Sequence, residues 1–397
     1  MKKKQVLIIN CGWEQETLIR RCAEKFSVIG IHHNDDYVLK NKIEKVYIGD
    51  LRDLKFIEAV YNRHNFTAVL SNQCDYSLFS QSYLCTKYNL PGPNLKAAQL
   101  SNSKYLQRKV GAQKGINAPD YKLVWSLEEA RRAIKKIGLP AIIKPNDNRG
   151  SFGVSKIETQ NELKEAYFHA LQNSISRGVI IESYIKGLHV AVDGYYFKGE
   201  YKSLALGWRH MDTNKEQVAV RMTYGVGDTA IENKIMKIHE KVCSEFNYDF
   251  GFNHGEYIVD NKGGVYLVEN TNRGGGVYLS EIVVPAVSGI DHVGNLINDA
   301  TSNLKINTPK KIARKPVSVS FIKFNPGKIK AIGYPKEKDD RIIKEKLFRK
   351  VNDTIKPIHS GADRDGIIII SGTEDVDHLT QNYQNSVELQ YTSVKSN

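Results

Sequence analysis

The sequence lacks the short signatures that identify many nucleotide-binding and metal-binding proteins. No GxGxxG follows the first apolar run, where "NCGWEQE" stands instead, so a dinucleotide-binding dehydrogenase is not indicated. No GxxxxGK(S/T) is present, which excludes a P-loop. The five cysteines form no CxxC and no His/Cys cluster at zinc spacing, and their odd number argues against a disulfide framework. We therefore expect a cytoplasmic protein in a reducing compartment.

Long apolar runs and charge of one sign in dense blocks are also missing. No stretch approaches the roughly 18 apolar residues that a membrane-spanning helix needs, so no membrane partner is expected. "MKKKQVLIIN" has only a short apolar run after its lysines and is predicted to be a first strand, not a signal peptide. The formal net charge is +13, but the lysines are spread out, with a mild excess at 309–316. Such a balance suits anionic small molecules such as nucleotides, and a nucleic-acid or ribosomal partner is the less favoured alternative.

Strand and helix signals alternate over the first hundred residues. Strand-like runs lie at 5–10, 27–33, 45–49 and 66–72, and helical patterns lie between and after them at 16–26, 51–65 and 75–90. This spacing predicts βαβ units on a parallel sheet, and "PGPN" at 91–94 is typical of the end of a domain. Past residue 187 the strand signals become antiparallel in type, and the segment from 317 onward indicates a small β-rich module.

A lysine and a polar loop follow an apolar strand in "IIKPNDNRGSFGV". Lys144 closes the strand, and the loop behind it contains Arg149, Gly150, Ser151 and Gly153. Backbone N–H groups and a hydroxyl in such a loop can lie along a polyphosphate, with Lys144 supplying positive charge. A β-turn beside a lysine that extends to solvent explains the same residues, so the loop alone does not decide between the two.

A second candidate element is "IIESYI", where an apolar strand ends. The residues at this end are Glu182, Ser183, Tyr184 and Ile185. An adenine could lie here, its exocyclic amine meeting a carboxylate or carbonyl and its ring edge meeting a backbone N–H. Taken alone, the stretch is explained more simply as a strand end with a solvated glutamate.

Two glutamates flank a tight turn in "EYIVDNKGGVYLVEN", residues 256–270. If Asp260 pairs with Val265, the hairpin register places Glu256 opposite Glu269. Opposed carboxylates destabilise a strand pair unless a divalent cation lies between them. Oxygen ligands of this kind, completed by the Thr271 hydroxyl or by the amide of Asn270 or Asn272, favour Mg²⁺ or Mn²⁺ together with a nucleotide phosphate.

The alternative for the same pair is two exposed glutamates on a solvent face. Ile258 and Leu267, which the predicted register places on the face of the glutamates, argue for burial instead. Arg273 follows directly, in front of three glycines, and could reach a transferring phosphoryl group or an anionic intermediate. The glycines would let a substrate approach the backbone closely.

Taken in order, these elements resemble the ATP-grasp superfamily, specifically its carboxylate–amine ligases and biotin-carboxylase-like members. The resemblance covers roughly residues 1–300, and the C-terminal module more loosely. Lys104 in "SNSKYLQRKV" matches the lysine on the helix that opens the family's nucleotide domain, and Lys144 matches the lysine of its lid strand. The flexible phosphate loop matches 149–153, and the adenine hinge matches 182–185.

The ribose and metal positions complete the resemblance. His189 in "GLHVAVDG" matches a ribose-contacting position. The family's metal motif, an acidic residue on one strand and E-x-N-x-R on the next, matches Glu256 and "ENTNR" at 269–273. Thr271 stands where the family has asparagine, which weakens the metal site without abolishing it.

The resemblance implies a fold that is α/β and α+β. Its parts are an N-terminal Rossmann-like parallel sheet (the pre-ATP-grasp domain, 1–100), a two-lobed ATP-grasp domain (101–310, lid lobe about 121–186) and a small β-rich C-terminal module (311–397). It also implies ATP and Mg²⁺ (or Mn²⁺) as cofactors. The implied reaction joins a carboxylate and an amine through an acylphosphate, forming an amide or peptide bond and releasing ADP and phosphate.

The resemblance implies positioning and charge neutralisation by Lys144, Arg273 and Arg221. Arg221, in "VAVRMTYG", is equally well explained as a surface arginine at a strand end. The expected partners are a small-molecule carboxylate and amine, and a homodimer is a further expectation. A kinase, a ligase acting on a macromolecular acceptor and a nucleotide-binding protein without turnover stay open as alternatives.

Overall fold

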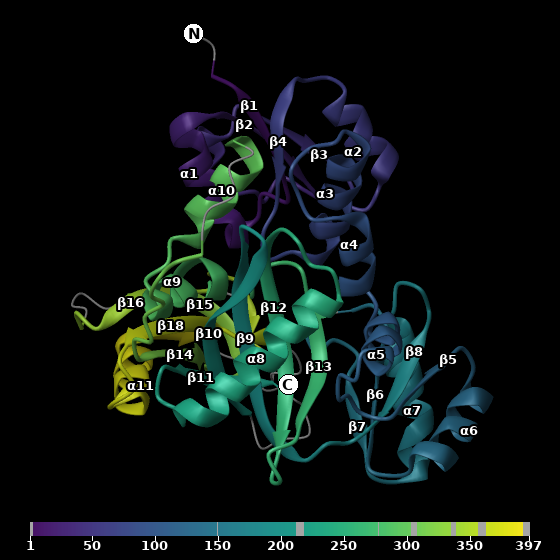
Figure 1. Ribbon diagram of the computed structural model, residues 1–397. Helices are drawn as coiled ribbons and strands as arrows, with labels where there is room; N and C mark the ends of the chain where they lie inside the picture. Colours follow the sequence, from purple (N-terminus) through teal and green to yellow (C-terminus); the bar gives the residue numbers. More distant parts are fainter. Residues whose placement is uncertain are drawn as a thin grey trace.

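The protein is described here from a computed structural model that covers residues 3–148, 150–211, 218–276, 278–302, 308–334, 339–355 and 363–391. Figure 1 shows an N-terminal layer at the top, a large central sheet below it, and a smaller lobe that projects to one side. No helix within these ranges is long and apolar enough to cross a membrane.

The N-terminal layer is a parallel sheet, as the sequence predicts. Its strands are β1 (Gln5–Ile9), β2 (Ser27–His32), β3 (Lys45–Ile48) and β4 (Phe66–Leu70), in the order β3-β2-β1-β4. The helices of this layer are α1 (Glu16–Lys25), α2 (Leu54–Tyr61) and α3 (Asp75–Lys87), with short 3₁₀ turns at Trp13–Gln15 and Lys40–Lys42. The carboxyl ends of β1, β2 and β4 meet at the edge that faces the rest of the molecule, where parallel α/β sheets bind ligands.

The projecting lobe is a four-stranded antiparallel sheet backed by two helices. Its strands are β5 (Tyr121–Val124), β6 (Ala141–Pro145), β7 (Ser155–Ile157) and β8 (Val179–Ser183), in the order β5-β8-β6-β7. Its helices are α6 (Leu127–Ile137) and α7 (Leu163–Gln172), the second preceded by a 3₁₀ turn at Gln160–Glu162. Ser126 caps α6 through Glu129 N–H, and Thr159 forms a capping box with Glu162. The chain reaches this lobe through α4 (Leu95–Ser101) and α5 (Lys104–Gln113).

The central sheet has eight strands and continues into the C-terminal part of the chain. The strand order is β13-β12-β9-β10-β11-β14-β18-β16. Their bounds are β9 Gly187–Phe197, β10 Glu200–Met211, β11 Ala219–Tyr224, β12 Gly251–Asp260, β13 Val265–Thr271, β14 Val317–Ile322, β16 Ile342–Leu347 and β18 Gly366–Ser371. Each neighbouring pair is antiparallel, so the antiparallel prediction for this part is confirmed.

Helices cover both faces of the central sheet. Helix α8 (Thr229–Glu245) lies on one face, and the other face meets a π-helical turn (Leu279–Val283), α9 (Val284–Ser288), α10 (His292–Ser302) and the N-terminal layer. One apolar cluster runs from Val6 and Ile8 of β1 to Tyr195 of β9 and Val319 of β14. The remaining elements are β15 (Gly327–Gly333), β17 (Thr354–Ile355), α11 (Val376–Ser386) and β19 (Glu388–Tyr391). The division at 311 stays a prediction, because β14 pairs directly with β11.

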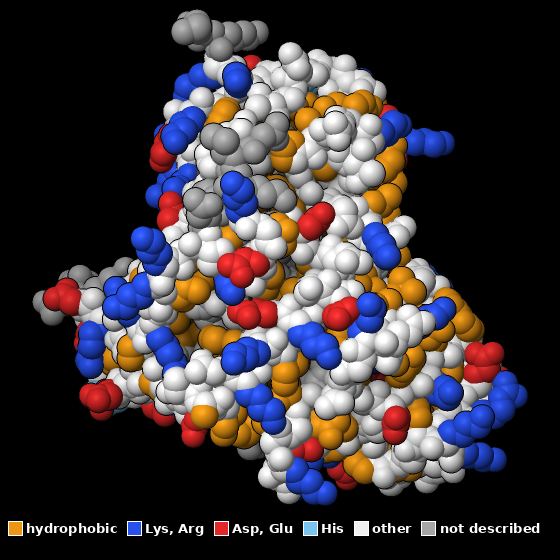
Figure 2. Space-filling model, in the orientation of Figure 1, with side chains coloured by type: hydrophobic (Ala, Val, Ile, Leu, Met, Phe, Trp, Pro, Cys, Tyr) orange, Lys and Arg blue, Asp and Glu red, His pale blue; other side chains and the backbone are white. Residues whose placement is uncertain are grey.

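Positive charge is not gathered into a single patch on the face drawn in Figure 2. Lys and Arg side chains lie scattered among acidic and apolar ones over all three parts of that view. This agrees with the diffuse balance expected from the sequence.

Candidate active site

The two glutamates of the hairpin face each other across β12 and β13, as predicted. The register pairs Glu256 with Glu269. Nearer the turn, Val259 pairs with Val265, one position away from the predicted Asp260–Val265 pair. A β-bulge at Val268 adds the missing residue and restores the predicted alignment at the glutamates.

The bulge also corrects the prediction about the face that the glutamates share. Leu267 pairs with Tyr257 and packs beside Val259 and Val265 against the α8 side. It therefore lies on the face opposite Glu256, because neighbouring strand residues point to opposite faces. Ile258 stays on the glutamate side and is 9% exposed. Burial of that face thus rests on Ile258 and its neighbours and not on Leu267.

Glu256 is held by two positive side chains on the same face. Arg209 of β10 lies with Nη1 2.5 Å from Glu256 Oε2, and His254 Nε2 lies 3.6 Å from Oε1. Burial acts to raise the pKa of Glu256, but Arg209 and His254 together outweigh it and keep this pKa well below its usual range. His254 in turn contacts Asp193 Oδ1 at 2.9 Å. Burial acts to lower its pKa, yet Asp193 and Glu256 raise it to about 9, so the imidazole is charged near neutral pH.

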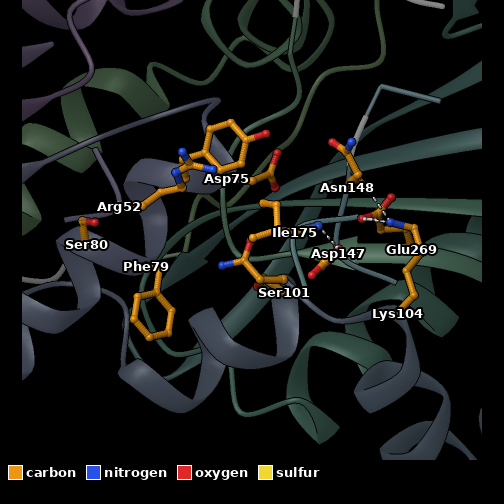
Figure 3. A pocket seen from close by; sticks show the side chains of 12 residues that line it. Arg52, Asp75, Phe79, Ser80, Ser101, Lys104, Asp147, Asn148, Ile175 and Glu269 are labelled. Carbon is orange, nitrogen blue, oxygen red and sulfur yellow. Dashed lines mark hydrogen bonds and ion pairs between the residues drawn. The ribbon is translucent and has the colours of Figure 1, made fainter. Parts of the chain in front are cut away.

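Glu269 is held by Lys104, the first residue of α5. Lys104 Nζ lies 3.1 Å from Glu269 Oε1 and donates to the backbone oxygen of Asn148 at 2.5 Å. Figure 3 shows both contacts side by side. Lys104 thereby joins the central sheet to the loop that follows β6.

A buried charge cluster lies between β6 and β8 of the projecting lobe and helix α5. Lys144 Nζ is 2.7 Å from Glu182 Oε2, and Arg108 Nε donates to Glu182 Oε1 at 2.9 Å. Burial is the main cause that lowers the pKa of Lys144. Burial acts to raise the pKa of Glu182, but Arg108 and Lys144 outweigh it and lower this pKa. Because Glu182 is 2% exposed, the interpretation as a solvated strand end does not hold.

Arg108 is a candidate that the sequence analysis missed. It is 1% exposed, donates from Nη2 to the Val268 backbone oxygen at 2.6 Å, and has no partner for Nη1 among the described residues. The signal that could have found it is its spacing, because four residues after Lys104 it shares the same face of α5. An orphaned buried donor between Lys104 and Lys144 fits an anionic ligand at this place.

Arg273 is fixed by an acid from the N-terminal layer. Asp75, the first residue of α3, accepts from Arg273 Nε and Nη2 at 2.9 Å each. The Thr271 hydroxyl also lies 3.3 Å from Asp75 Oδ1. Asp75 follows the carboxyl end of β4, a position at which ligand-binding residues of parallel sheets are expected. Thr271 thus turns its oxygen toward Asp75, on the same side as Glu269.

The glycine loop contributes its backbone to the site. Arg149 lies outside the described residues. Gly150, Ser151 and Gly153 have positive φ values of 62°, 62° and 73°. A Cβ on Gly153 would lie 2.7 Å from the Cβ of Asn173, so the turn requires glycine there. Gly150 and Ser151 line the main cleft.

The other hinge residues lie at the edge of the lobe. Ser183 Oγ accepts from Asp120 N–H at 3.0 Å, Tyr184 N–H donates to the Pro140 oxygen at 3.2 Å, and Ile185 is half-buried. His189 is half-buried on β9, between Ile258 of β12 and Arg209 of β10. Burial, reinforced by Arg209, lowers the pKa of His189 to about 4.

Arg221 is the predicted residue that the structure does not bring to the site. In the register it lies between His210 and Ser320, whereas Met222 beside it aligns with Arg209. Its side chain therefore points away from Glu256, and Nη1 lies 2.5 Å from Asp377 of α11. A shift of one position moves a strand residue to the other face, so the stretch "VAVRMTYG" alone did not show which face Arg221 takes. Arg209 takes the place expected for Arg221.

Lys104, Glu256, Glu269, Arg209 and Arg273 line one or both of two neighbouring hollows. The main cleft, about 880 Å³, lies between the N-terminal layer, the loop after β6, the central sheet and the C-terminal segment at 346–350. A smaller pocket of about 230 Å³ opens between α3, Lys104 and the same loop (Figure 3). Asp75 and Glu269 line both. The two hollows therefore meet at the ion pairs of Arg273 and Lys104.

Residues 137–281 match the sequence model of the ATP-grasp domain. The chain contains an ATP-grasp domain. The predicted resemblance is thereby confirmed at the level of the superfamily. The match begins just before Lys144 and ends after Arg273, so it includes Lys144 and Glu182 of the buried charge cluster, the opposed glutamates and Arg273, whereas Lys104 and Arg108 precede it.

The known proteins that are similar to this chain include ligases and a synthetase. A D-alanine–D-alanine ligase from Delftia acidovorans is 30% identical over 96 residues, 24% of this chain and 29% of that protein. The structure of an L-amino acid ligase from Bacillus licheniformis superposes with a TM-score of 0.85 at 16% identity, covering 99% of this chain and all of that one. A phosphoribosylglycinamide synthetase from Anaerococcus prevotii superposes with a TM-score of 0.76 at 20% identity, covering 98% of this chain and all of that one.

The extent of these likenesses limits what they establish. The sequence matches span about a third or less of the length of the first curated relatives. The structural likenesses, at such low identity, establish the ATP-grasp fold over the described chain. ATP and Mg²⁺ are used by ATP-grasp enzymes, and one similar biotin carboxylase domain was solved with MgADP. Within the described ranges, no group of three or more His, Cys, Asp and Glu side chains is arranged to hold a metal by itself.

Proposed function

We propose that the protein is an ATP-dependent carboxylate–amine ligase. It phosphorylates a substrate carboxylate with ATP and lets an amine displace the phosphate, forming an amide or peptide bond and releasing ADP and phosphate. The observation that carries this proposal is the pair Glu256–Glu269, which lines one cleft while Lys104 pairs with Glu269 and Arg209 pairs with Glu256. Few other roles explain two opposed carboxylates on a sheet face that lines a cleft.

The nucleotide belongs between the lobe and the central sheet. Arg108 and Lys144 supply two buried positive charges there against the single carboxylate of Glu182. Lys104 lies at the edge that opens toward Glu269. This excess of buried positive charge, with the orphaned Arg108 Nη1, supports binding of a triphosphate. The hinge at 182–185 lies at the end of the same strand and would take the adenine.

The donor set of the opposed glutamates fits a magnesium ion. Mg²⁺ prefers one or two carboxylates plus substrate phosphates, so two protein carboxylates without a third are suitable. When bound, Mg²⁺ would neutralise phosphate charge between the carboxylates and the nucleotide. Glu256 and Glu269 would hold it. Thr271 contributes its hydroxyl at most weakly, since this hydroxyl lies 3.3 Å from Asp75.

Arg273 and the glycines behind it would orient the acid. The guanidinium lines the cleft and is held in a fixed direction by Asp75, so it can pair with the carboxylate oxygen that accepts the phosphoryl group. The loop at 150–153 lies over the same region and would exclude water from the acylphosphate. The amine then forms the C–N bond as the C–O bond to phosphate breaks, and it loses a proton.

The names of the relatives suggest the substrate class. A D-alanine–D-alanine ligase and an L-amino acid ligase both join amino acids by their names, so we propose an amino acid or a similar small amine and acid as substrates. Cys11, Cys22, Cys85 and Cys243 are buried thiols, which supports a reducing cytoplasm as the compartment. A homodimer stays a prediction, supported by a biotin carboxylase domain that is described as a dimer.

The test is phosphate release from Mg·ATP by wild type and Glu269→Gln, with pooled carboxylates offered alone and with amines. We expect release that requires both a carboxylate and an amine and falls in the variant by on the order of a hundredfold or more. Glu128→Gln, at an exposed glutamate of α6, is the matched control and should behave as wild type. Nucleotide binding without release from any pool would contradict the proposal for those substrates. Release with a carboxylate alone, unchanged by amines, would indicate a kinase.

A further inference from the structure

The strand that carries Glu269 lies at the edge of the central sheet. In the strand order, β13 comes first and pairs with β12 on one side, and no strand within the described ranges pairs with its other side. The β-bulge at Val268, directly before Glu269, interrupts the ladder to β12. An edge strand with an interrupted ladder is held by fewer backbone hydrogen bonds than a central strand, so the direction of Glu269 depends on other contacts.

Helix α5 supplies hydrogen bonds along this edge. Gln107 Oε1 accepts from the Asn270 N–H at 2.9 Å, and Arg108 Nη2 donates to the Val268 oxygen at 2.6 Å. The two bonds come from consecutive residues of the helix and reach the residues directly after and directly before Glu269. Helix α5 therefore fixes the backbone on both sides of this glutamate.

The amide of Gln107 is oriented at both of its ends. The side chain is fully buried, and its Nε2 donates to the backbone oxygens of Leu100 at 3.1 Å and Ser101 at 3.3 Å, at the end of α4. With the amide nitrogen directed to α4, the amide oxygen is directed to the Asn270 N–H. An apolar atom in place of this oxygen would leave a buried N–H without its acceptor.

The N-terminus of α5 is anchored to the loop that follows β6. Asn146 accepts from the Lys104 N–H through its backbone oxygen at 3.0 Å and from the Tyr105 N–H through Oδ1 at 2.9 Å. Both N–H groups belong to the first turn of the helix, where the helix itself offers no acceptor. From the same turn, Lys104 Nζ reaches Glu269 Oε1. The lobe, α5 and Glu269 thus form one connected support.

A carboxylate that binds Mg²⁺ needs an accurate support. This ion demands near-ideal octahedral geometry, and removing a partner that orients one of its ligands typically costs about 10–100-fold in metal affinity. Because Gln107 is fully buried, it can influence a ligand of the cleft only through the residues that it holds. The residue that it holds on β13 is Asn270, the direct neighbour of Glu269.

We propose that Gln107 is a positioning residue for Glu269, because it fixes the edge of β13 so that the carboxylate meets the metal ion of the bound nucleotide. This inference rests on the proposed function, since it takes Glu269 as a metal ligand. It deepens that function by adding α5 to the parts of the chain that set the affinity for the metal. A glutamine that only packed the core would lower stability and leave the contribution of Mg²⁺ to nucleotide binding unchanged.

The test measures binding of AMPPNP, a non-hydrolysable ATP analogue, to the full chain by calorimetry, in excess Mg²⁺ and in excess EDTA. We call the ratio of the two affinities the magnesium gain. Gln107→Met keeps the size of the side chain and loses the acceptor, so it should lower the magnesium gain by about tenfold and leave the affinity in EDTA within about twofold. Gln107→Glu, which burial keeps neutral, retains an acceptor oxygen and should keep most of the gain.

The matched control is the same substitution at another buried glutamine. Gln81 of α3 is 3% exposed and donates from Nε2 to the Val69 oxygen at 3.0 Å. Gln81→Met should keep the wild-type magnesium gain. An equal loss of the gain in both Met variants would show a general effect of a lost buried hydrogen bond and would overturn the proposal.

A double variant shows whether Gln107 acts through Glu269. Glu269→Gln should lower the magnesium gain, and Gln107→Met added to it should change the remaining gain by less than about twofold, because residues that act through one group are not additive. A further tenfold loss in the double variant would show that Gln107 acts on another ligand, which contradicts the proposal.

The remaining outcomes separate this proposal from the proposed function. A wild-type gain in Gln107→Met overturns the role of Gln107 and leaves the ligase standing, and the absence of any gain in wild type overturns Glu269 as a metal ligand and this role with it. If Gln107→Met does not fold, Gln107→Asn, whose shorter side chain does not reach Asn270, decides by the same comparison. Phosphate release that no carboxylate–amine pair evokes would sink the ligase, while a magnesium gain that depends on Gln107 would stand.

Discussion

The two faces of the central sheet each bury a histidine, and the two histidines are in opposite charge states. On the α8 face, His239 contacts the hydroxyls of Tyr201 at 3.1 Å and Tyr257 at 2.8 Å, and burial lowers its pKa to about 3. On the cleft face, His254 contacts Asp193 and Glu256, and its pKa rises to about 9. The two histidines are buried to a similar extent, so the neighbouring side chains determine the direction in which each pKa shifts.

This contrast distinguishes the α8 face of the central sheet, which packs the core, from the cleft face, which gathers the candidate site residues. On the α8 face, the buried polar side chains are neutral and hydrogen bond to one another. Asn253 and Asn270, for example, form a hydrogen bond there at 2.7 Å. The cleft face gathers full charges around open space. Buried polar groups that are neutral and have their hydrogen-bond partners within the protein indicate a role in stability. Buried groups that are charged and lack some of these partners indicate a binding site.

The largest expected difference comes from two neighbouring residues of β12 that point to opposite faces. Glu256→Gln should lower phosphate release by on the order of a hundredfold, because one metal ligand is lost. Tyr257→Phe should leave turnover per folded molecule unchanged. It should cost about 1–3 kcal/mol of unfolding free energy, since His239 Nδ1 and Asn270 Nδ2 lose a partner. Urea unfolding and steady-state kinetics on both variants check this, and equal loss of activity in the two would contradict the separation of the faces.

Two glycines, one beside the charged network of the cleft face and one beside His239 on the α8 face, allow the two faces to be compared by substitution. A Cβ on Gly275 would lie 2.6 Å from Asp193 Oδ1 and 2.9 Å from His254 Nδ1, whereas one on Gly255 would lie 2.5 Å from His239 Nδ1. Gly275→Ala should therefore displace the charged network and lower kcat/KM by about tenfold or more. Gly255→Ala should instead destabilise the fold by about 1–3 kcal/mol. Steady-state kinetics and denaturation on both variants check this. A loss of stability without a kinetic effect in Gly275→Ala, together with a kinetic effect in Gly255→Ala, would contradict the distinction between the two faces.

The charge states predict a pH dependence for the α8 face. The pKa of His239 is about 3 in the fold and near 6.5 in an unfolded chain, so the unfolded state binds the extra proton first. The stability that neutral His239 contributes is present above pH 6.5 and is lost as the pH falls toward 3, by at most about 1.4 kcal/mol per pH unit.

His239→Gln should flatten this part of the stability curve. Unfolding free energy measured between pH 4 and 7 checks it. His189, whose pKa is about 4, titrates in the same direction in both proteins and serves as the internal reference. A variant curve parallel to that of wild type would show that His239 does not titrate as stated.

The smallest expected effect is at Arg221. Its partner Asp377 is exposed, and exposed ion pairs contribute about 1 kcal/mol or less, so Arg221→Gln should change stability by no more than that. Its kcat/KM should stay within about twofold, while Arg209→Gln, which removes the partner of Glu256, should lower it by about tenfold. A larger kinetic effect at Arg221 than at Arg209 would restore the role that the sequence suggested for it.

Much of the fold follows from sequence pattern, because strand and helix periods are local. The alternation before residue 91 predicts the parallel sheet, and the opposition of Glu256 to Glu269 follows from the hairpin. The bulge at Val268 is not predictable in this way, since the register nearer the turn and the register at the glutamates differ by one residue. Because the bulge lies between Leu267 and Glu269, the predicted pairing is right at the glutamates and the predicted face is wrong at Leu267.

The rest of the site depends on contacts between distant segments. Arg108 and His254 could have been predicted from the sequence. Arg108 lies four residues from Lys104 on one helix, and His254 lies two residues from Glu256 on one strand, so each shares a face with a predicted site residue. Asp75 meets Arg273 across 198 positions of sequence, and Arg364 meets the Ala219 oxygen across 145. No local pattern specifies such pairs, and only the packing of the layers brings them together.

The hydrogen-bonded join between β11 and β14 has a consequence for engineering. Because the C-terminal strands continue the central sheet, cutting the chain near 311 would expose the edge of β11 with its unpaired backbone groups. Such a truncation would produce an aggregation-prone fragment instead of a minimal enzyme. Recombination with relatives should therefore exchange the lobe at 121–186, which has a sheet of its own, and keep the two ends of the chain from a single parent.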